Sequence, residues 1–271
     1  MDREPAVAGR FYPARARVLA EKVASLLGER PGGLPSAEPA RAVIGVLAPH
    51  AGYVYSGPVA GATFARVAVP ERAVVMCPNH TGRGEPVSLW PEGAWVTPLG
   101  RVALDAELTQ DLSGCPLVAP DRDAHRFEHA LEVQLPFLQR RRPDVSIAAL
   151  CLAHLRFEEC QVLGEALAGA VRRRPALLVA SSDMSHYLPA RVARAKDERA
   201  LERFLALDPR GLYEVVQRED ISMCGFIPAT VMLVASLALG ATRAELVRYG
   251  HSGEASGDDS AGVGYAGALV Y

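Results

Sequence analysis

Three of the seven histidines stand just after apolar runs of the kind that form buried strands. The runs end in GVLAPH at His50, in VVMCPNH at His80 and in LLVASSDMSH at His186. Ligands of an open α/β sheet bind beyond the carboxyl ends of the strands, so three such loops can bring their imidazoles to one place. Imidazole is a frequent metal ligand and titrates near neutral pH, so convergence indicates a metal site, acid–base chemistry, or both. The spacing leaves these open, together with the alternative that each histidine simply hydrogen-bonds backbone at the end of its strand.

Two further residues near predicted loops suit the same chemistry. Asp183 lies three residues before His186, close enough for its carboxylate to orient that imidazole. It is also suited to cap the N-terminus of a following helix. Cys224 stands near the start of an apolar helix, where a thiolate has a lowered pKa and can bind a metal or act as a nucleophile. A free cysteine is more often a small buried apolar residue. We expect this of the other cysteines, Cys77, Cys115, Cys151 and Cys160.

The segment DAHRFEHALEVQLPFL, residues 123–138, has the apolar periodicity of an amphipathic helix. Residues three or four apart are neighbours on a helix, so His129 and Glu132 are expected on one face, close to Glu128. This trio either points together toward a site or forms a solvated face beside the apolar stripe.

The remaining histidines are weaker candidates. His154 ends a fourth predicted strand and is a candidate by position alone, whereas His125 and His251 are expected in solvated loops. Gly52 and Gly57 follow His50 and allow either a close backbone approach to a ligand or ordinary turn geometry.

Alternating apolar runs and amphipathic segments predict a βαβ chain with a mostly buried sheet. Strands are expected at 42–48, 73–77, 145–152, 176–180, 245–249 and 262–271. Helices are expected at 58–66, 105–113, 128–141, 157–173, 191–207 and 229–239. A turn-rich connection is expected at 31–39. The sequence therefore predicts a single α/β domain over residues 1–271, with a central mixed sheet flanked by helices.

Composition and charge argue against several classes of protein. The 271 residues include 29 Lys and Arg against 31 Asp and Glu, so we expect neither nucleic acid nor a membrane surface as a partner. The longest uncharged stretches are interrupted by proline and glycine, which argues against a transmembrane helix. The chain starts without an apolar targeting segment and has no CxxC, so we expect the cytoplasm. Neither GxGxxG nor a P-loop occurs in the histidine loops, which removes the main support for a nucleotide site.

Seven ordered motifs cover nearly the whole chain. They are REPAVAGRFYP, PHAGYVYSG, PNHTG, EHALEVQLPFLQ, SSDMSHY, CGFIP and SGEASGDDSAGVGYAGAL. In these motifs the sequence resembles the Memo family, whose bacterial and archaeal members are called AmmeMemoRadiSam system protein B. The resemblance implies a fold similar to the class III extradiol ring-cleaving dioxygenases, with a mononuclear metal held in a cleft.

The resemblance also implies a ligand set. Two histidines and a cysteine hold the metal in the family, and the matching residues here are His50, His80 and Cys224. Family members are described with iron and with copper, so we expect Fe(II) first, with copper or zinc as alternatives. Extradiol dioxygenases use a carboxylate where this chain has Cys224. Because a thiolate is the softer ligand, catechol cleavage does not follow from the fold alone. Thr81 replaces a second histidine of the animal members, which removes one alternative ligand.

The acid–base histidine of the dioxygenases matches His186, and the resemblance implies that Asp183, His129 and Glu132 line or support the site. Tyr53 would line the substrate pocket. The resulting hypothesis is an iron- or copper-dependent redox enzyme or dioxygenase that acts on a small molecule. The alternative is a non-catalytic module whose cleft recognises a peptide or a modified side chain, since animal members are described as binding phosphotyrosine peptides. A third possibility is an accessory partner of AMMECR-type and radical-SAM proteins.

Overall fold

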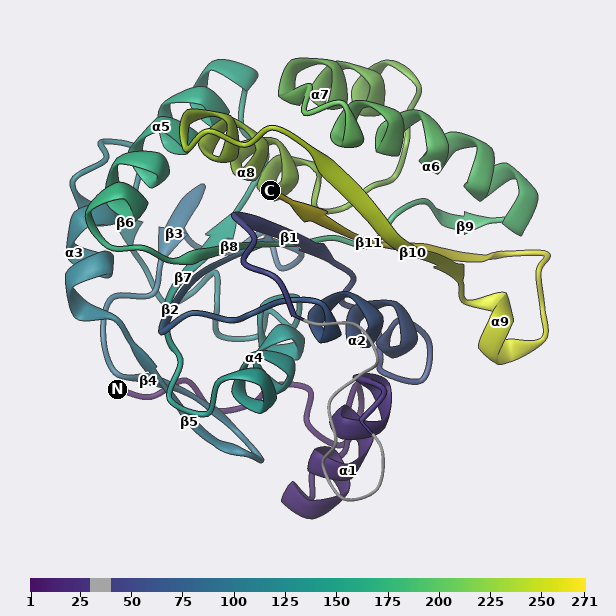
Figure 1. Ribbon diagram of the computed structural model, residues 1–271, viewed down its shortest axis with the longest axis horizontal. Helices are drawn as coiled ribbons and strands as arrows, with labels where there is room; N and C mark the ends of the chain where they lie inside the picture. Colours follow the sequence, from purple (N-terminus) through teal and green to yellow (C-terminus); the bar gives the residue numbers. More distant parts are fainter. Residues whose placement is uncertain (30–39) are drawn as a thin grey trace.

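The computed structural model describes residues 1–29 and 40–271, which form an α/β fold around one mixed sheet (Figure 1). The strands are β1 (Gly45–Ala48), β2 (Arg72–Pro78), β3 (Val87–Leu89), β4 (Ala94–Thr97), β5 (Gly100–Leu104), β6 (Ala119–Pro120), β7 (Ser146–Leu152), β8 (Leu177–Ser181), β9 (His186–Leu188), β10 (Ala244–His251) and β11 (Gly262–Val270). The main path of the sheet runs β10-β11-β1-β8-β2-β7-β3-β6. Off this path β4 pairs with β5, β5 with β7, and β9 with β11.

Helices cover both faces of this sheet. They are α1 (Ala16–Leu26), α2 (Gly57–Ala65), α3 (Ala106–Ser113), the short 3-10 helix η1 (Glu132–Gln134), α4 (Leu135–Arg141), α5 (Phe157–Arg173), α6 (Ala190–Leu205), α7 (Pro209–Arg218), α8 (Phe226–Ala238) and α9 (Gly253–Ser256). Buried side chains of α1, α2 and α4 belong to one core, and those of α3, α5, α6, α7 and α8 to the other. In Figure 1, α1, α2 and α4 lie below the strands, α5 to α8 lie above them, and α3 lies at the left end.

The central strands are apolar on both faces because a core lies on each side of them. In β1, Leu47 packs into the core of α5 and α8, whereas its neighbours Val46 and Ala48 pack into the core of α1 and α2. In β2, Met76 and Val75 divide between the two cores in the same way. Because both faces of these strands are buried, their sequences are continuous apolar runs, and such runs predict buried strands.

Most of the expected elements are confirmed. The strands predicted at 42–48, 73–77, 145–152 and 176–180 are β1, β2, β7 and β8, and the two C-terminal strands are β10 and β11. The helices predicted elsewhere than 128–141 correspond to α2, α3, α5, α6 and α8. The α/β fold with a mixed sheet flanked by helices is thereby confirmed. The sequence analysis missed α1, α7, α9 and the short strands β3 to β6 and β9.

The helix predicted at 128–141 is wrong in its first half. The chain forms turns until η1, and the regular helix α4 begins only at Leu135, with Pro136 in its first turn. Proline suits the first turn of a helix and disfavours a helical residue before it. The Glu128 carboxylate also accepts a hydrogen bond from the Ala130 N–H, at 2.9 Å, which fixes a turn instead of a helical repeat.

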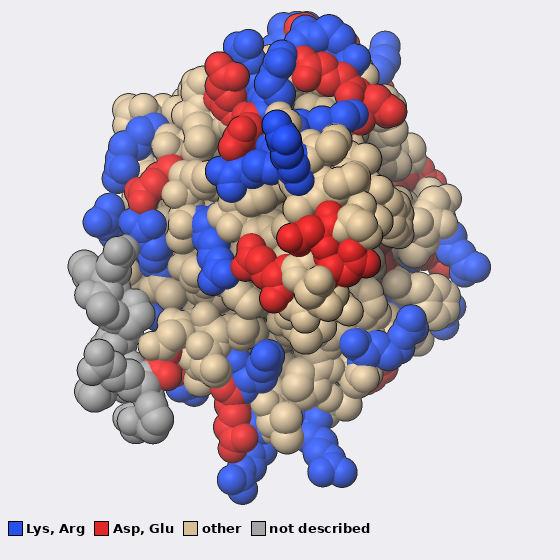
Figure 2. Space-filling model, turned by 90° about the vertical axis from the view of Figure 1, so that its right-hand side faces the viewer, with Lys and Arg blue, Asp and Glu red and all other residues tan. Residues whose placement is uncertain are grey.

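Two further expectations concern the surface. Among the residues described, no helix combines the length and the apolar character needed to cross a bilayer. On the face shown in Figure 2, acidic and basic side chains are interspersed, and Lys and Arg are densest at the top, the end that carries α6 and α7 in Figure 1. The turn-rich connection expected at 31–39 lies outside the described residues.

Candidate metal centre

Three adjacent parallel strands bring the sequence-predicted residues together. Strand β8 lies between β1 and β2, and both pairings are parallel. His50, Asp183 and His80 each follow the end of one of these strands by two residues. The order in space, β1-β8-β2, differs from the order in sequence, as expected where ligands bind an open sheet.

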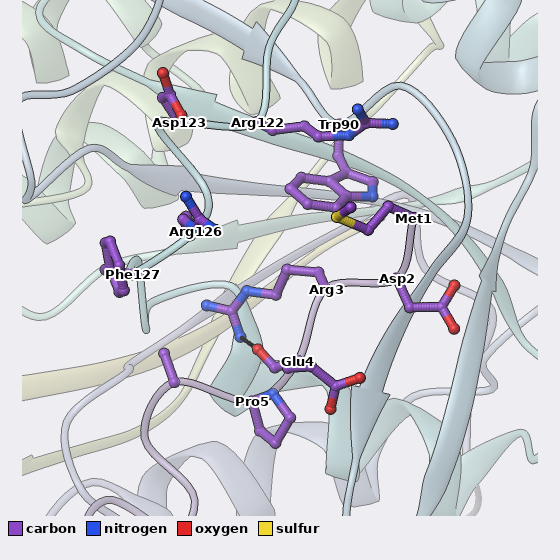
Figure 3. Close-up of a pocket in the computed structure, with 11 residues that line it drawn as sticks. Met1, Asp2, Arg3, Glu4, Pro5, Trp90, Arg122, Asp123, Arg126 and Phe127 are labelled. Atoms are coloured by element: carbon purple, nitrogen blue, oxygen red, sulfur yellow. Dashed lines mark hydrogen bonds between the residues drawn. The ribbon is translucent and has the colours of Figure 1, made fainter.

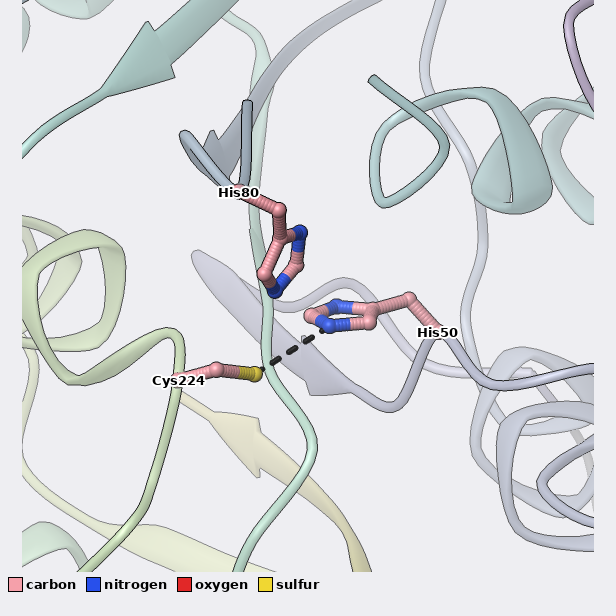
Figure 4. A group of neighbouring side chains, drawn as sticks. All are labelled: His50, His80 and Cys224. Carbon is pink, nitrogen blue, oxygen red and sulfur yellow. Dashed lines mark hydrogen bonds between the residues drawn. The ribbon is translucent and has the colours of Figure 1, made fainter. Parts of the chain in front are cut away.

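His50, His80 and Cys224 form a compact trio at this edge (Figure 4). One ligand atom from each lies within 4.8 Å of the others, and the Cys224 Sγ is 3.2 Å from the His50 Nε2. Cys224 comes from the loop before α8, which packs tightly on the end of β8. A Cβ at Gly225 would lie 2.2 Å from the Ser181 carbonyl oxygen, so only glycine allows this approach.

The ring of His50 is oriented by Ser181. The Ser181 hydroxyl donates to the Ala130 carbonyl at 2.6 Å and accepts from the Gln134 side-chain amide at 2.8 Å. Its hydrogen is therefore used, so the His50 Nδ1–H must be the donor in their 2.9 Å contact. This leaves the Nε2 lone pair directed toward Cys224.

The ring of His80 is oriented by a buried carboxylate. Glu128 accepts from the His80 Nδ1 at 2.9 Å and from the His80 backbone N–H at 2.7 Å, and it is fully buried. A hydrogen bond from Nδ1 to a carboxylate is a common support for a metal-binding histidine, because it fixes the tautomer and leaves Nε2 free.

Burial and neighbouring charges shift the pKa values of His50 and His80 in opposite directions. Burial lowers the pKa of His50 well below its ordinary value, and the neighbouring histidines lower it further, so His50 is neutral. Burial also opposes protonation of His80, but the hydrogen bond and charge of Glu128 outweigh it and raise that pKa. Burial opposes ionisation of Glu128, but the hydrogen bond and charge of His80, the hydrogen bond from the Ala130 N–H and the charge of His129 together outweigh it and lower that pKa.

The expected activation of Cys224 by the start of α8 is not seen. Burial raises the pKa of its thiol, and the nearby Asp183 carboxylate raises it further, although the Asp183 backbone N–H donates to the sulfur at 3.3 Å. Burial likewise raises the pKa of Asp183 to about 6, although backbone N–H groups oppose this effect. Without a bound cation the sulfur is therefore a thiol, and a metal would have to displace its proton.

Comparison with known proteins identifies the family of this chain. The family model described as Memo-like protein matches residues 3–269. The chain belongs to the Memo-like protein family. A MEMO1 family protein of Methanosarcina barkeri is 44% identical over 271 residues, covering 99% of both chains. One from Methanothermobacter thermautotrophicus is 40% identical over 276 residues, covering 98% of this chain and 99% of the relative.

The solved structures show the same architecture at low sequence identity. The crystal structure of an uncharacterized protein from Escherichia coli K12 superposes with a TM-score of 0.58 at 15% identity, covering 83% of this chain and 99% of the other. At this identity the similarity concerns the fold of the Memo-like chain alone.

His129 lies beside His50 and His80 in this Memo-like site, whereas the Glu132 carboxylate is directed toward Arg3. The ring centroid of His129 is 4.9 Å from that of His80 and 5.4 Å from that of His50. Burial lowers its pKa, although Glu128 partly opposes the shift. The Glu132 carboxylate instead pairs with Arg3 and accepts from the Tyr12 hydroxyl at 2.5 Å. The expectation that His129 and Glu132 share a helix face is wrong, because no helix forms over residues 128–131.

Asp183 and His186 are both near the site, but they do not form the predicted pair. The Asp183 carboxylate accepts the backbone N–H of His50 at 2.7 Å, so it holds the His50 loop. The Nδ1 of His186 instead lies 2.8 Å from the Ser222 carbonyl oxygen, on the loop that carries Cys224. Asp183 does not cap a helix either, because β9 follows it.

Three other expectations are corrected by burial. Tyr53 is 3% exposed, with its ring against Phe137 and its hydroxyl on the Val133 carbonyl at 2.7 Å, so it belongs to the core and has no free polar atom for a substrate. His125 is fully buried, with Nε2 3.2 Å from the Ser88 carbonyl oxygen, and His251 is buried at the end of β10. His154 is exposed at the end of β7.

Sequence analysis singled out Glu128 but missed two other residues that support the site, Ser181 and Arg3. Ser181 was visible as part of the SSDMSH motif, directly at a strand end, and this position was the available signal. Arg3 gave no local signal. It is 2% exposed, and its guanidinium donates to the carbonyl oxygens of His125 and Glu128, more than 120 residues away in the chain.

Proposed function

We propose that this chain is a mononuclear metalloprotein with a redox or dioxygenase activity on a small molecule, and that His50, His80 and Cys224 hold the metal. The observation that carries the proposal is the set of three ligand atoms within 4.8 Å of one another. We expect Fe(II) as the physiological metal, with copper or zinc as alternatives.

The residues present fit such a metal. Two imidazoles and one sulfur are ligands that Fe, Cu and Zn accept. The Nδ1 contacts leave the Nε2 atom of each ring for the ion, and the His50 Nε2 lies 3.2 Å from the Cys224 Sγ, which would be a ligand of the same ion. The remaining nitrogen of each ring already has a partner, in Ser181 for His50 and in Glu128 for His80. Rings held in this way lose little conformational freedom when they bind an ion, which favours affinity.

A bound redox metal would supply electron transfer and Lewis acidity at this point. The chain itself would supply positioning and proton transfer. His186 gives its Nδ1–H to the Ser222 carbonyl, which can only accept, so its Nε2 is available to take a proton from a substrate hydroxyl. The neutral ring of His129 lies between the two histidine ligands and Phe11, where it can contact a bound substrate.

The experiment is metal reconstitution followed by an oxygen-uptake assay. The purified chain is loaded anaerobically with Fe(II), and the metal content is measured for the parent, His50→Ala and His154→Ala. We expect about one ion per chain in the parent, loss of metal in His50→Ala and retention in His154→Ala, since His154 is exposed outside the trio. Equal affinity in parent and His50→Ala contradicts the ligand set. Metal-dependent oxygen consumption with catechols or small reductants supports catalysis.

A second function, recognition of a peptide or modified side chain without turnover, is favoured by one observation. In the described part of the chain the exposed tyrosine and phenylalanine side chains are Tyr55, Phe127 and Tyr187. Tyr55 lies in the loop after His50, Phe127 in the turn before Glu128, and Tyr187 in β9, next to His186. Tyr187 also has a φ of 57°, a strained value of the kind found at functional sites.

One experiment distinguishes the catalytic function from the binding function. The metal-loaded chain is titrated with phosphotyrosine and assayed for oxygen uptake with the catechol panel. Saturable binding that weakens in Tyr187→Ala, with no oxygen uptake, supports the binding role. Reproducible turnover excludes a purely non-catalytic protein. An accessory role with AMMECR-type and radical-SAM proteins is a further proposal, which co-purification from cells tests.

A further inference from the structure

A cavity of about 520 Å³ lies apart from the metal ligands, between the N-terminal residues 1–6 and the loop that carries residues 122–127 (Figure 3). None of His50, His80 and Cys224 lines it. Small-molecule sites commonly measure about 300–1,000 Å³, so the cavity is large enough for an organic ligand.

The wall of the cavity offers apolar and aromatic surface. Trp90 and Phe127 line it together with Met1, Pro5 and Ala6. Trp90 is 4% exposed and is packed against Trp95 and Arg122, so it forms a rigid side. Phe127, by contrast, is 56% exposed and is accessible to a ligand. Two aromatic rings on one cavity suit a ligand with an apolar or aromatic body.

Most charges on the wall are already neutralised. Arg3 pairs with Glu132, Arg122 with Glu92 at 2.6 Å, and Asp2 with Arg101. These pairs leave three charged residues of the wall without an ion-pair partner in the described residues, Glu4, Asp123 and Arg126.

Arg126 differs from the other arginines on the wall. No carboxylate lies within ion-pair distance of it in residues 1–29 or 40–271, and its guanidinium carbon is 5.9 Å from the centre of the Phe127 ring. In Figure 3 the carboxylate of Asp2 lies across the view from Arg126 and that of Glu4 lies beside Pro5, whereas Asp123 is drawn above Arg126. Among the charged residues of the wall, Arg126 is therefore the cation without an ion-pair partner in the described residues, and it stands next to an aromatic ring; Glu4 and Asp123 are the carboxylates of the wall without one.

We propose that this cavity binds a small organic anion, whose carboxylate is received by Arg126 and whose apolar body packs against Trp90 and Phe127. A guanidinium offers two parallel N–H donors to a carboxylate, and this geometry selects a planar anion over a neutral isostere. The site is independent of the metal chemistry, because it uses none of the candidate ligands.

The test compares 3-phenylpropionate with its neutral amide, 3-phenylpropionamide. Both carry the same ring, and only the first is an anion. Trp90 and Trp95 are the two tryptophans of the chain, so tryptophan emission reports occupancy. We expect saturable binding of the carboxylate, about tenfold or more tighter than the amide. In Arg126→Gln this preference should fall to about onefold, while binding of the amide is unchanged.

Arg83→Gln is the matched control. Arg83 also lies over Phe127, at 5.5 Å from the ring centre, and also has no carboxylate partner in the described residues, but it does not line the cavity. Its replacement should leave the preference for the carboxylate intact. Equal affinity of acid and amide in the parent, retention of the preference in Arg126→Gln, or its equal loss in Arg83→Gln would each overturn the proposal.

Discussion

Glu128 and Glu132 are two fully buried carboxylates four residues apart, and they serve different parts of the molecule. Glu128 accepts hydrogen bonds from the side chain and backbone of His80. Glu132 pairs with Arg3 and accepts the N–H groups of Ala6 and Val7. The first carboxylate orients a candidate metal ligand, and the second holds the N-terminal segment against the core. The residue type alone therefore does not reveal a functional role, whereas the partner of the buried charge does.

The largest expected effect is the loss of stability on replacement of Glu132. Glu132→Ala leaves the Arg3 guanidinium buried without its carboxylate, and breaking such a pair costs about 3–5 kcal/mol of the free energy of unfolding. Denaturant titration measures the loss. Glu71→Ala is the control, because Glu71 forms only exposed pairs with Arg72 and Arg142, worth about 0–1 kcal/mol. Similar losses in both variants would show that Arg3 is stabilised without Glu132.

The pH dependence of stability should be dominated on this side by His125, which lies between Trp90 and Trp95. Burial lowers the pKa of His125 to about 4, although its hydrogen bond to Ser88 opposes the effect. In the unfolded chain the ring titrates near 6.5, so between these values the unfolded state binds more protons. Stability therefore falls as the pH drops from about 6.5 to about 4, by about 3 kcal/mol.

The measurement is the difference between the parent and His125→Gln in unfolding free energy across that window. Glutamine can still donate to the Ser88 carbonyl, so the variant keeps the hydrogen bond and removes the titrating group. His50 has a lowered pKa for the same reason and contributes to the slope in both proteins, and the subtraction removes its contribution. Identical slopes in the two proteins would mean that His125 is protonated without penalty.

The core of the fold was predictable because its signal is local. The runs that became β1, β2 and β8 are apolar on both faces and are each followed by a loop residue, so the convergence of His50 and His80 followed from the sheet. The ligand role expected of Cys224 came from the family resemblance, and in the structure its sulfur lies within 4.8 Å of ring nitrogens of His50 and His80. The failures come from long-range partners. Arg3 satisfies carbonyls of the 125–128 turn, and no local pattern signals such a contact.

The wrong helix prediction in the segment after residue 123 has the same cause, a set of long-range partners. Its apolar spacing suits a helix, but His125 and Glu128 are both buried and each finds a hydrogen-bond partner outside the segment, in Ser88 and His80. Turns let these side chains point in different directions, as a helix would not. The sequence pattern therefore predicts correctly that these residues are buried, but it predicts a helix where the backbone forms turns.

On the Glu128 side we expect a smaller free-energy change that appears in metal binding. Glu128→Gln replaces an acceptor that takes three N–H groups, from His80 twice and from Ala130, with an amide that also presents donors. The affinity for Fe(II) or for Zn²⁺ as a probe should fall about 10–100-fold. Glu132→Gln is the matched control and should keep the affinity of the parent within about twofold once the protein is folded. Equal losses in the two variants would erase the functional distinction between the carboxylates.

The smallest expected effect tests whether Tyr53 belongs to the core or to the site. Its hydroxyl donates to the Val133 carbonyl, next to Glu132, and its ring packs against Tyr12 and Phe137. Tyr53→Phe removes one buried hydrogen bond and leaves the packing intact, so stability should fall by about 1 kcal/mol with metal affinity unchanged. The check is denaturant titration beside a metal titration of the same preparation. A variant of normal stability with weakened metal or catechol binding would place Tyr53 with Glu128 and His80, as a residue that shapes the site through the loop after His50.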